Sequence, residues 1–234
     1  MHSSTLMQER PLVLELAGLA GAGKTALSDA LGRRSDACHT GLGVYGLPKL
    51  SLACNVFRLF PFCVTLCGYR ACSDERTKQM VRLRTLLQVL IRELSQPWRM
   101  IMLDEGPVFA LSWLDMFWTP TGMDRGFRRW RRQAIQEWAA RLDKIVWLDA
   151  PDMLLARRIR ERAKGHPLKD KSDGQVLDFL GRFRASYERV ISELTAGDGP
   201  KTIRFATDWD SPDRIAEHLL DEVATERTEC QHLV

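Results

Sequence analysis

The 234-residue sequence lacks several features that would place it in other functional classes. Its six cysteines form no C-x-x-C pair, and no histidine accompanies Cys63, Cys67 and Cys72 at zinc-finger spacing. We therefore expect reduced thiols that pack inside a cytosolic protein, not a metal site or a disulfide framework. No internal repeats or low-complexity stretches occur. Residues 1–10 are polar and have no signal-peptide core, so we expect a cytoplasmic protein.

A large excess of basic charge is also missing. The formal net charge is +4, which suits an enzyme with anionic substrates but is far below that of a dedicated nucleic-acid binder. Apolar residues make up 45% of the chain, which is ample for a core and excludes disorder over most of its length.

The chain does contain a phosphate-binding loop. Residues 18–25, Gly-Leu-Ala-Gly-Ala-Gly-Lys-Thr, match G-x-x-x-x-G-K-[S/T] at every fixed position. The apolar run Leu12–Ala17 before them predicts a buried strand, and the apolar spacing of residues 26–31 predicts a helix after them. Glycines let consecutive backbone N–H groups face phosphate oxygens, and the helix N-terminus adds partial positive charge. We therefore predict that the protein binds a nucleoside triphosphate.

Specific roles follow for the residues of this loop. Lys24 is expected to reach the β- and γ-phosphates, and the Thr25 hydroxyl is expected to bind Mg²⁺. The predicted nucleotide-binding residues are Gly18, Ala20, Gly21, Ala22, Gly23, Lys24, Thr25 and Ala26.

Apolar, β-rich runs recur along the chain, each followed by a helical pattern, which predicts a parallel sheet with crossover helices. They are Leu12–Ala17, Met100–Asp104, Lys144–Asp149 and Lys201–Ala206, with a weaker fifth candidate at Gly41–Gly46. The expected fold class is α/β, a three-layer P-loop NTPase fold with about five parallel strands flanked by helices and a helical lid. We expect one domain over residues 11–226, with its lid at about 157–175, and flexible ends at 1–10 and 227–234.

Helices are expected at Ser73–Gln96, Arg125–Leu142, Asp152–Lys164, Gln175–Leu194 and Ser211–Thr225, the last with Ser211 as N-cap. The Leu50–Gly68 segment is nearly all apolar, with Arg58 its only charge and Pro61 in its middle. It approaches the length of a membrane span, but the proline and the arginine favour a pair of buried or interfacial helices. Packing in the core or lid is the preferred interpretation, ahead of peripheral contact with a membrane surface and of a membrane span.

Two acidic residues end the predicted strand at residues 100–104. Asp104 at the carboxyl end of this strand should lie beside the phosphate loop, where open parallel sheets bind ligands. We therefore predict that Asp104 holds Mg²⁺ opposite Thr25. Glu105 is a candidate either for the general base of an attacking hydroxyl or for a residue that assists the metal. The alternative is that one of the pair caps the following helix.

Arginines gather in the predicted helix at residues 152–164. Arg158 and Arg162 are four residues apart and so share a helix face. Together they could clamp the triphosphate and stabilise charge on the transferring phosphoryl group. The alternative is an ordinary solvated helix face.

With these pieces in place, the chain resembles the thymidylate kinase-like and deoxynucleoside kinase group of P-loop kinases. Residues 148–151, the arginine-rich helix, the lysine-rich turn and the F-x-x-x-[apolar]-R-x-x-Y pattern at 179–187 are similar to the lid of these kinases. Residues 206–208 and 211–215 are similar to the loop that borders the adenine. The resemblance implies a kinase that uses ATP and Mg²⁺. Kinases of this group are often dimers, so the resemblance is also compatible with a homodimer.

The chain departs from these families on the acceptor side. Thymidylate kinases usually carry Asp-Arg after the third strand and deoxynucleoside kinases carry Glu-Arg-Ser, whereas this chain has Asp104-Glu105-Gly106. The acidic residue that these families place after the second strand is also missing near 41–49. The acceptor is therefore either a nucleoside or nucleotide or a less polar molecule. The aromatic residues Trp113, Phe117 and Trp118 favour a less polar acceptor, and the alternative is that they belong to the core.

The leading hypothesis is a phosphotransferase that moves the γ-phosphoryl group of ATP to a small-molecule hydroxyl or phosphate. Its predicted catalytic residues are Lys24, Asp104, Glu105, Arg158 and Arg162, and its predicted metal ligands are Thr25 and Asp104. One alternative is a nucleotide-gated regulatory NTPase, disfavoured because no N-K-x-D motif occurs. Two further alternatives are a kinase of a lipid-like alcohol and a kinase of nucleic-acid 5′ ends. The arginines and aromatics of residues 125–132 suggest the nucleic-acid kinase, but a solvated helix face is the favoured interpretation of that segment.

Overall fold

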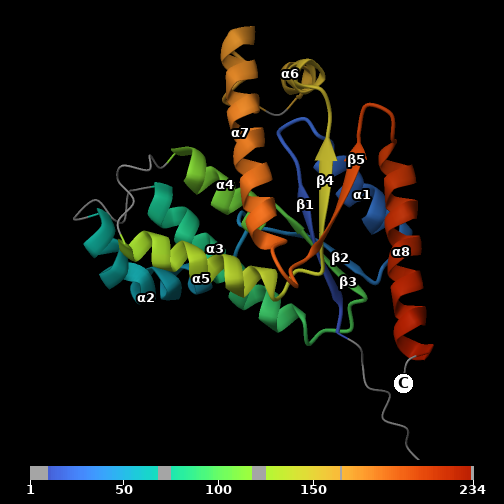
Figure 1. The fold of residues 1–234 in the computed structure, drawn as a ribbon, viewed down its shortest axis with the longest axis horizontal. Coiled ribbons are helices and arrows are strands. Elements are labelled where there is room, and N and C mark those ends of the chain that lie inside the picture. Colours follow the sequence, from blue (N-terminus) through green and yellow to red (C-terminus); the bar gives the residue numbers. More distant parts are fainter. Residues whose placement is uncertain (1–9, 68–74, 118–124, 164, 233–234) are drawn as a thin grey trace, which may run out of the picture.

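In the computed structural model, five parallel strands form one sheet at the centre of the protein (Figure 1). The structure describes residues 10–67, 75–117, 125–163 and 165–232, with side chains at all of these except 60–67 and 226–232. The strand order is β2-β3-β1-β4-β5. The strands are β1 (Leu12–Ala17), β2 (Cys38–Leu42), β3 (Met100–Asp104), β4 (Lys144–Asp149) and β5 (Lys201–Ala206). This confirms the predicted α/β fold class and the bounds of four strands.

The prediction for the second strand was wrong by several residues. The structure places β2 at Cys38–Leu42, not at Gly41–Gly46. At Gly43 the backbone lies against the end of the partner strand: an added Cβ would be 1.8 Å from the Asp104 carbonyl oxygen, and β3 itself ends at Asp104. The chain therefore leaves the sheet at this point, and the Val44 N–H donates to the Glu105 carbonyl oxygen at 3.0 Å.

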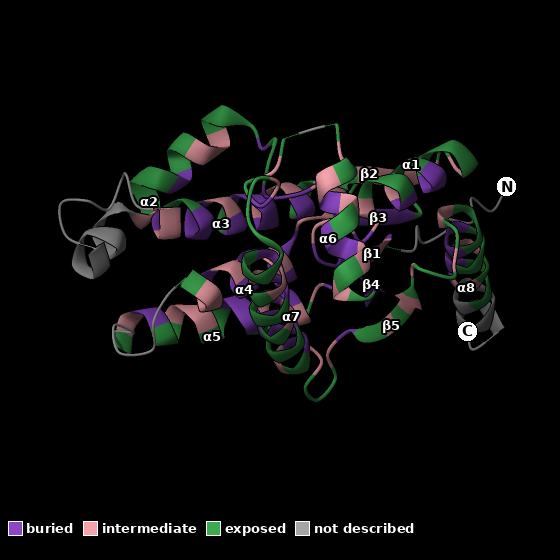
Figure 2. Ribbon diagram, turned by 90° about the horizontal axis from the view of Figure 1, so that it is seen from above, coloured by how far each residue is buried: buried purple, intermediate pink, exposed green. Residues whose placement is uncertain are grey.

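Helices cover both faces of the sheet (Figures 1 and 2). Helix α1 (Lys24–Arg34) packs on α8 (Pro212–His232) on one face. The other face is covered by α3 (Glu75–Glu93), α4 (Pro107–Phe117), α5 (Arg125–Ala139) and α7 (Asp173–Leu194). Because both faces are covered, the central strands β1 and β3 are apolar along nearly their whole length, as is typical of parallel sheets.

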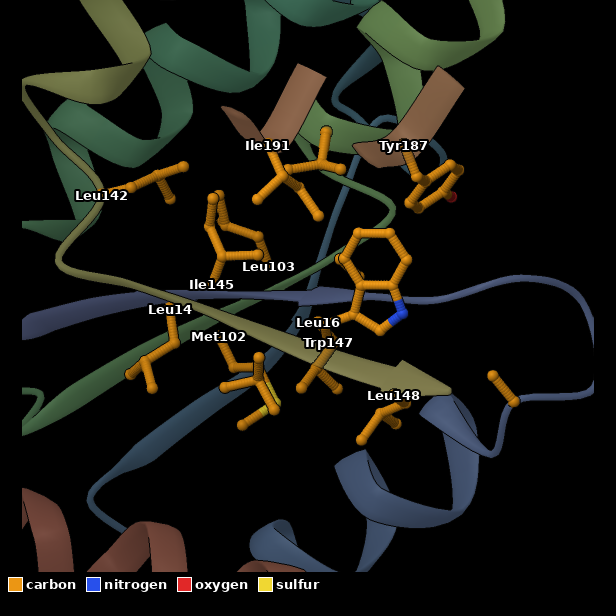
Figure 3. Packing of buried hydrophobic residues seen from close by; sticks show 14 of the residues in the cluster. Leu14, Leu16, Met102, Leu103, Leu142, Ile145, Trp147, Leu148, Tyr187 and Ile191 are labelled. Atoms are coloured by element: carbon orange, nitrogen blue, oxygen red, sulfur yellow. The ribbon is translucent and has the colours of Figure 1, made fainter. Parts of the chain in front are cut away.

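The core between the sheet and α7 is built from large side chains (Figure 3). The Trp147 indole of β4 lies edge-on to the Tyr187 ring of α7, with 6.2 Å between the ring centroids. Tyr187 is 1% exposed, and Leu103, Ile145 and Ile191 lie on the same side of the sheet, whereas Leu14, Leu16 and Met102 fill the core on the opposite side (Figure 3). Burial of this apolar surface is the main force that holds α7 to the sheet.

The apolar segment after β2 forms one helix, α2 (Lys49–Cys67), so the prediction of a helix pair was wrong. A proline inside a helix removes one backbone hydrogen bond and more often bends a helix than ends it. The buried face of α2 presents Asn55, whose amide N–H groups donate to Thr85 Oγ1 at 3.0 Å and Gln88 Oε1 at 2.8 Å on α3. Leu50 and Phe57 lie on its exposed face. None of the described helices is long and apolar enough to cross a bilayer.

Local caps confirm other helix predictions. The Ser211 hydroxyl accepts from the Arg214 N–H at 3.3 Å at the start of α8. That helix continues past its expected end to His232. At the start of α7, Ser172 and Gln175 form a capping box. The helix begins at Asp173, two residues before the predicted start at Gln175. Helix α6 (Asp152–Glu161), which precedes α7, ends before the predicted Lys164. Lys164 lies outside the described residues, as do Cys72, Ser73 and Trp118.

Candidate active site

The phosphate loop joins β1 to α1 in the expected way. Gly21 and Gly23 have φ angles of 86° and 94°, a left-handed conformation that glycine adopts without strain and that other residues rarely adopt. These turns leave the backbone amides of the loop at the N-terminus of α1, which is a ready site for an anion. The geometry is that of a phosphate cradle.

Lys24 folds back over the loop. Its Nζ donates to the carbonyl oxygens of Gly18 at 2.7 Å and Leu19 at 3.4 Å. Burial lowers the pKa of the Lys24 ammonium, Asp104 and Glu105 oppose this shift, and Arg162 adds to it. The ammonium thus lies between the loop and the two acidic residues, where it can bind a phosphate group that enters the loop.

Asp104 ends β3 directly beside the strand that feeds the loop. In the sheet register Asp104 pairs with Leu16 of β1, two residues before Gly18. Asp104 Oδ1 is buried and has no hydrogen-bond partner among the described residues. A buried carboxylate oxygen without a partner is costly, and a Mg²⁺ ion or its water would satisfy it. Thr25, the other predicted ligand, lines the same cavity as Asp104, so the residues present fit the predicted metal. No cluster of three or more His, Cys, Asp or Glu side chains forms a further metal site in the described part of the chain.

Glu105 lies in a conformation that is unusual for its residue type. Its φ angle is 58°, and it is the one described residue other than glycine with a positive φ. Such a conformation costs free energy and persists only when neighbouring groups fix it. The Val44 N–H fixes it by donating to the Glu105 carbonyl oxygen, so the side chain leaves the backbone toward the cavity described below.

A buried acid, Glu15, lies behind this turn. Glu15 points from the middle of β1 and is 0% exposed. The Val108 N–H donates to its Oε1 and Oε2 at 2.9 and 3.0 Å, and the Phe109 N–H donates to Oε1 at 3.3 Å. Burial raises the pKa of Glu15 to about 8, although these backbone hydrogen bonds lower it. Glu15 thus caps α4, so neither Asp104 nor Glu105 is needed for that purpose.

The lid arginines both line the same cavity, but Arg158 has an additional role. Its Nη2 donates to the Thr207 carbonyl oxygen at 2.8 Å, and its Nη1 donates to Thr207 Oγ1 at 3.1 Å and to the Gly21 carbonyl oxygen at 3.3 Å. Arg158 therefore connects the phosphate loop to the end of β5. Near Arg162, burial and the charges of Arg162 and Lys24 lower the pKa of His166, which keeps that imidazole neutral.

Aromatic side chains from three segments form the opposite wall, which we call the aromatic wall. Its members are Tyr45, Phe109, Trp113, Phe117, Phe179, Phe183 and Tyr187. Neighbouring rings contact one another: Phe183 lies edge-on to Phe179 and Tyr187 with centroids 5.5 and 5.0 Å apart. Burial, reinforced by Glu15 and Glu105, raises the pKa of Tyr187 well above its ordinary value, so its hydroxyl stays protonated.

One cavity of about 600 Å³ unites these parts. Its lining contains every predicted nucleotide-binding and catalytic residue, together with His166 and the aromatic wall. The structure therefore brings together all the residues that the sequence predicted.

Sequence reasoning missed Glu15, Tyr45 and Phe109 as parts of the site. Phe179, Phe183 and Tyr187 belong to the lid-like pattern, but only their shared helix face could have placed them in the cavity. Glu15 was detectable as an acid within an apolar strand.

Two other predicted features are structural. Arg131, in the arginine-rich segment of α5, binds Asp115 with its Nη2 at 2.7 Å and Glu193 with its Nη1 at 2.5 Å. Trp130 stacks on the buried Phe127 with 5.7 Å between the ring centroids. The arginine of the lid-like pattern, Arg184, is paired with Asp149 and Asp152 and holds α7 to the start of α6.

Comparisons with known proteins identify the fold. No protein-family model matches the chain, and no curated protein matches it in sequence. Among solved structures, thymidylate kinase from Candida albicans matches with a TM-score of 0.58 at 11% identity, over 93% of this chain and 93% of that one. Deoxyadenosine kinase from M. mycoides matches with a TM-score of 0.56 at 13% identity, over 92% of this chain and all of that one. The chain has the P-loop kinase fold. At these identities the likeness concerns the fold alone, and function depends on the site.

Proposed function

We propose that this protein is a phosphotransferase that uses ATP and Mg²⁺ to phosphorylate a hydroxyl group of an uncharged acceptor with an aromatic or apolar body. The observation that carries the proposal is the single cavity in which the phosphate loop and lid arginines face Asp104, Glu105 and an aromatic wall. A regulatory NTPase needs the phosphate loop but has no use for a second, ring-lined compartment beside it.

The donor half binds the triphosphate. Loop amides and Lys24 hold its phosphates, and they are joined by Arg158 of α6 and by Arg162, the residue after this helix. Mg²⁺, held by Thr25 and Asp104, would neutralise phosphate charge during transfer. These groups stabilise the charge that spreads over the equatorial oxygens in the transition state.

The acceptor half supplies the nucleophile. The acceptor oxygen forms a bond to the γ-phosphorus as the bond to the β-phosphate oxygen breaks, which yields the phosphate ester and ADP. The hydroxyl proton passes to the Glu105 carboxylate, whose position beside Asp104 places it at the junction of the two halves. Closure of the lid segment around Arg162 and His166 would exclude water and suppress ATP hydrolysis.

The chemistry of the aromatic wall favours an uncharged acceptor. A phosphate monoester needs cations around its own phosphate. Among the described residues that line the cavity, however, the cations are Lys24, Arg158 and Arg162, which all belong to the donor half. The acceptor half instead presents rings and the Glu105 carboxylate. Arg82, the cation over the Tyr45 ring at 4.8 Å, is paired with Glu75 at 2.9 Å and does not line the cavity.

Matched pairs of acceptors test the proposal. Each pair consists of an alcohol and its phosphate monoester, for example a nucleoside and its 5′-monophosphate or an aromatic alcohol and its phosphate, assayed for ADP release and for the phosphorylated product. We expect transfer to the alcohol of a pair and none to the monoester, with Lys24→Ala as the inactive control. Preference for a monoester would refute the acceptor class, and ATP turnover that no acceptor stimulates would refute the phosphotransferase.

A further inference from the structure

The acid on the strand before the phosphate loop does more than fill the core. Glu15 is 0% exposed, lies three residues before Gly18, and binds the Val108 and Phe109 amides, which are 93 and 94 residues away in sequence. A buried carboxylate on a central strand is expensive, because transfer from water costs several kcal/mol unless hydrogen bonds compensate it. Its position therefore calls for an explanation beyond packing.

Helix α4 has no cap of its own. It begins at Pro107, so Gly106 occupies the N-cap position and offers no side-chain oxygen to the free amides of Val108 and Phe109. Those two amides are the N2 and N3 donors that an N-cap side chain normally satisfies. Glu15 satisfies both from the neighbouring strand, and its carboxyl oxygens lie at the positive end of the helix dipole.

Gly106 leaves the space that the Glu15 carboxyl group occupies. A Cβ added to Gly106 would lie 2.9–3.1 Å from the Cδ, Oε1 and Oε2 atoms of Glu15, and these are its three nearest neighbours. Any other residue at this position would therefore force the Glu15 carboxyl group to shift. Glu15, 91 positions earlier in the chain, thus accounts for the glycine at the third position of Asp104-Glu105-Gly106, where deoxynucleoside kinases carry serine.

The capped helix carries one side of the acceptor half. Its first turn follows Glu105 directly and contains Phe109, and its next turns carry Trp113 and Phe117 of the aromatic wall. Glu15 thus connects the strand that ends in the phosphate loop to the helix that faces the acceptor. A shift of α4 relative to β1 would move Glu105 and Phe109 away from the donor phosphates.

We propose that Glu15 is a positioning residue for the acceptor: by capping α4 from β1, it fixes Glu105 and Phe109 relative to the phosphate loop. The inference rests on the proposed phosphotransferase, because the acceptor is defined by it. Glu15 does not line the cavity and touches neither substrate. Its effect is exerted on the acceptor half, while the loop that binds ATP is built by other residues.

Three variants test this assignment: Glu15→Ala, Gly106→Ser, and the two combined. Each single change damages the cap, because Glu15→Ala leaves the two amides without an acceptor and the serine Cβ collides with the carboxylate. In the double variant the collision is gone, and the serine hydroxyl can cap Val108 and Phe109 locally. We expect the acceptor KM to rise about tenfold in each single variant, as a misplaced reacting group predicts. The double variant should return to within about threefold of the parent.

The dissociation constant of Mg·ATP should change by less than about twofold in all three variants, because their effect is confined to the acceptor half. Gly181→Ser on the exposed side of α7, where an added Cβ meets no atom within 4 Å, controls for the glycine replacement and should resemble the parent. A merely structural role of Glu15 would weaken ATP binding and acceptor binding together, and the double variant would then be the worst of the three. Either result overturns the assignment.

Amide hydrogen exchange at Val108 and Phe109 gives a readout that needs no acceptor. Exchange should accelerate in Glu15→Ala and slow again in the double variant, and unchanged exchange would overturn the capping role. If the parent protein transfers phosphate to no acceptor, the proposed function fails on that result alone, and the exchange measurement still decides whether Glu15 holds α4.

Discussion

The stability of this protein should depend on pH through Glu15. Its carboxyl has a folded-state pKa of about 8 against an ordinary value of 4.5, chiefly because burial disfavours the charged form. The folded state therefore binds a proton that the unfolded state releases between pH 4.5 and 8. The stabilisation is complete below pH 4.5 and is lost as the pH rises through 8.

The size of the effect follows from the linkage relation. One proton taken up on folding changes the free energy of unfolding by about 1.4 kcal/mol per pH unit, so Glu15 contributes a loss of about 3 kcal/mol between pH 5.5 and 7.5. In Glu15→Gln the side chain no longer titrates, and its amide oxygen can still accept from Val108 and Phe109. The difference in stability between parent and variant should therefore shift in favour of the variant as the pH rises.

Urea denaturation followed by tryptophan fluorescence measures this difference. The free energies of unfolding of parent and Glu15→Gln would be compared at half-unit steps from pH 5.5 to 8.5 without Mg²⁺, because other titrating groups cancel in the comparison. Glu217→Gln on the exposed side of α8 is the matched control and should give a curve parallel to the parent. A Glu15→Gln curve that is also parallel to the parent would refute the reasoning, because it would mean that Glu15 stays charged in the folded protein.

Three further outcomes are expected. Lys24→Ala should abolish binding of Mg·ATP in calorimetry without change in the circular dichroism spectrum, and retained phosphotransfer by this variant would contradict the mechanism. Arg158→Ala should weaken ATP binding about tenfold, because it removes a donor cation and the link to the end of β5, whereas Arg157→Ala, on the exposed side of the same helix, should bind ATP as the parent does. Asp115→Ala should lower the free energy of unfolding by about 3 kcal/mol, because it leaves Arg131 partly unpaired in a buried network, and a loss below about 1 kcal/mol would show that Glu193 alone suffices.

Local patterns determined much of the fold. The strands at Leu12–Ala17, Met100–Asp104, Lys144–Asp149 and Lys201–Ala206 were predictable to the residue, because a parallel sheet covered on both faces requires continuous apolar runs. The phosphate loop was equally predictable, since its glycines and Lys24 act through the backbone that immediately surrounds them.

Predictions were wrong where a distant segment decided the local structure. β2 ends at Leu42, beside the end of its partner strand β3, and no local pattern reveals this pairing. The α2 segment forms one helix, although its proline suggested two. In both places the weak or conflicting local preference was overruled by packing.

The sequence by itself determined the bounds of four strands and the phosphate-loop motif at the end of the first strand, because apolar runs and short motifs are local properties. Only the tertiary structure decided what faces the loop. The aromatic wall joins Tyr45, the rings of α4 and the rings of α7, which are more than 130 residues apart at the extremes. The cap that Glu15 of β1 provides to α4 likewise joins residues that are more than 90 positions apart. Such contacts depend on which elements become neighbours in space, and that is set by the packing of the whole core.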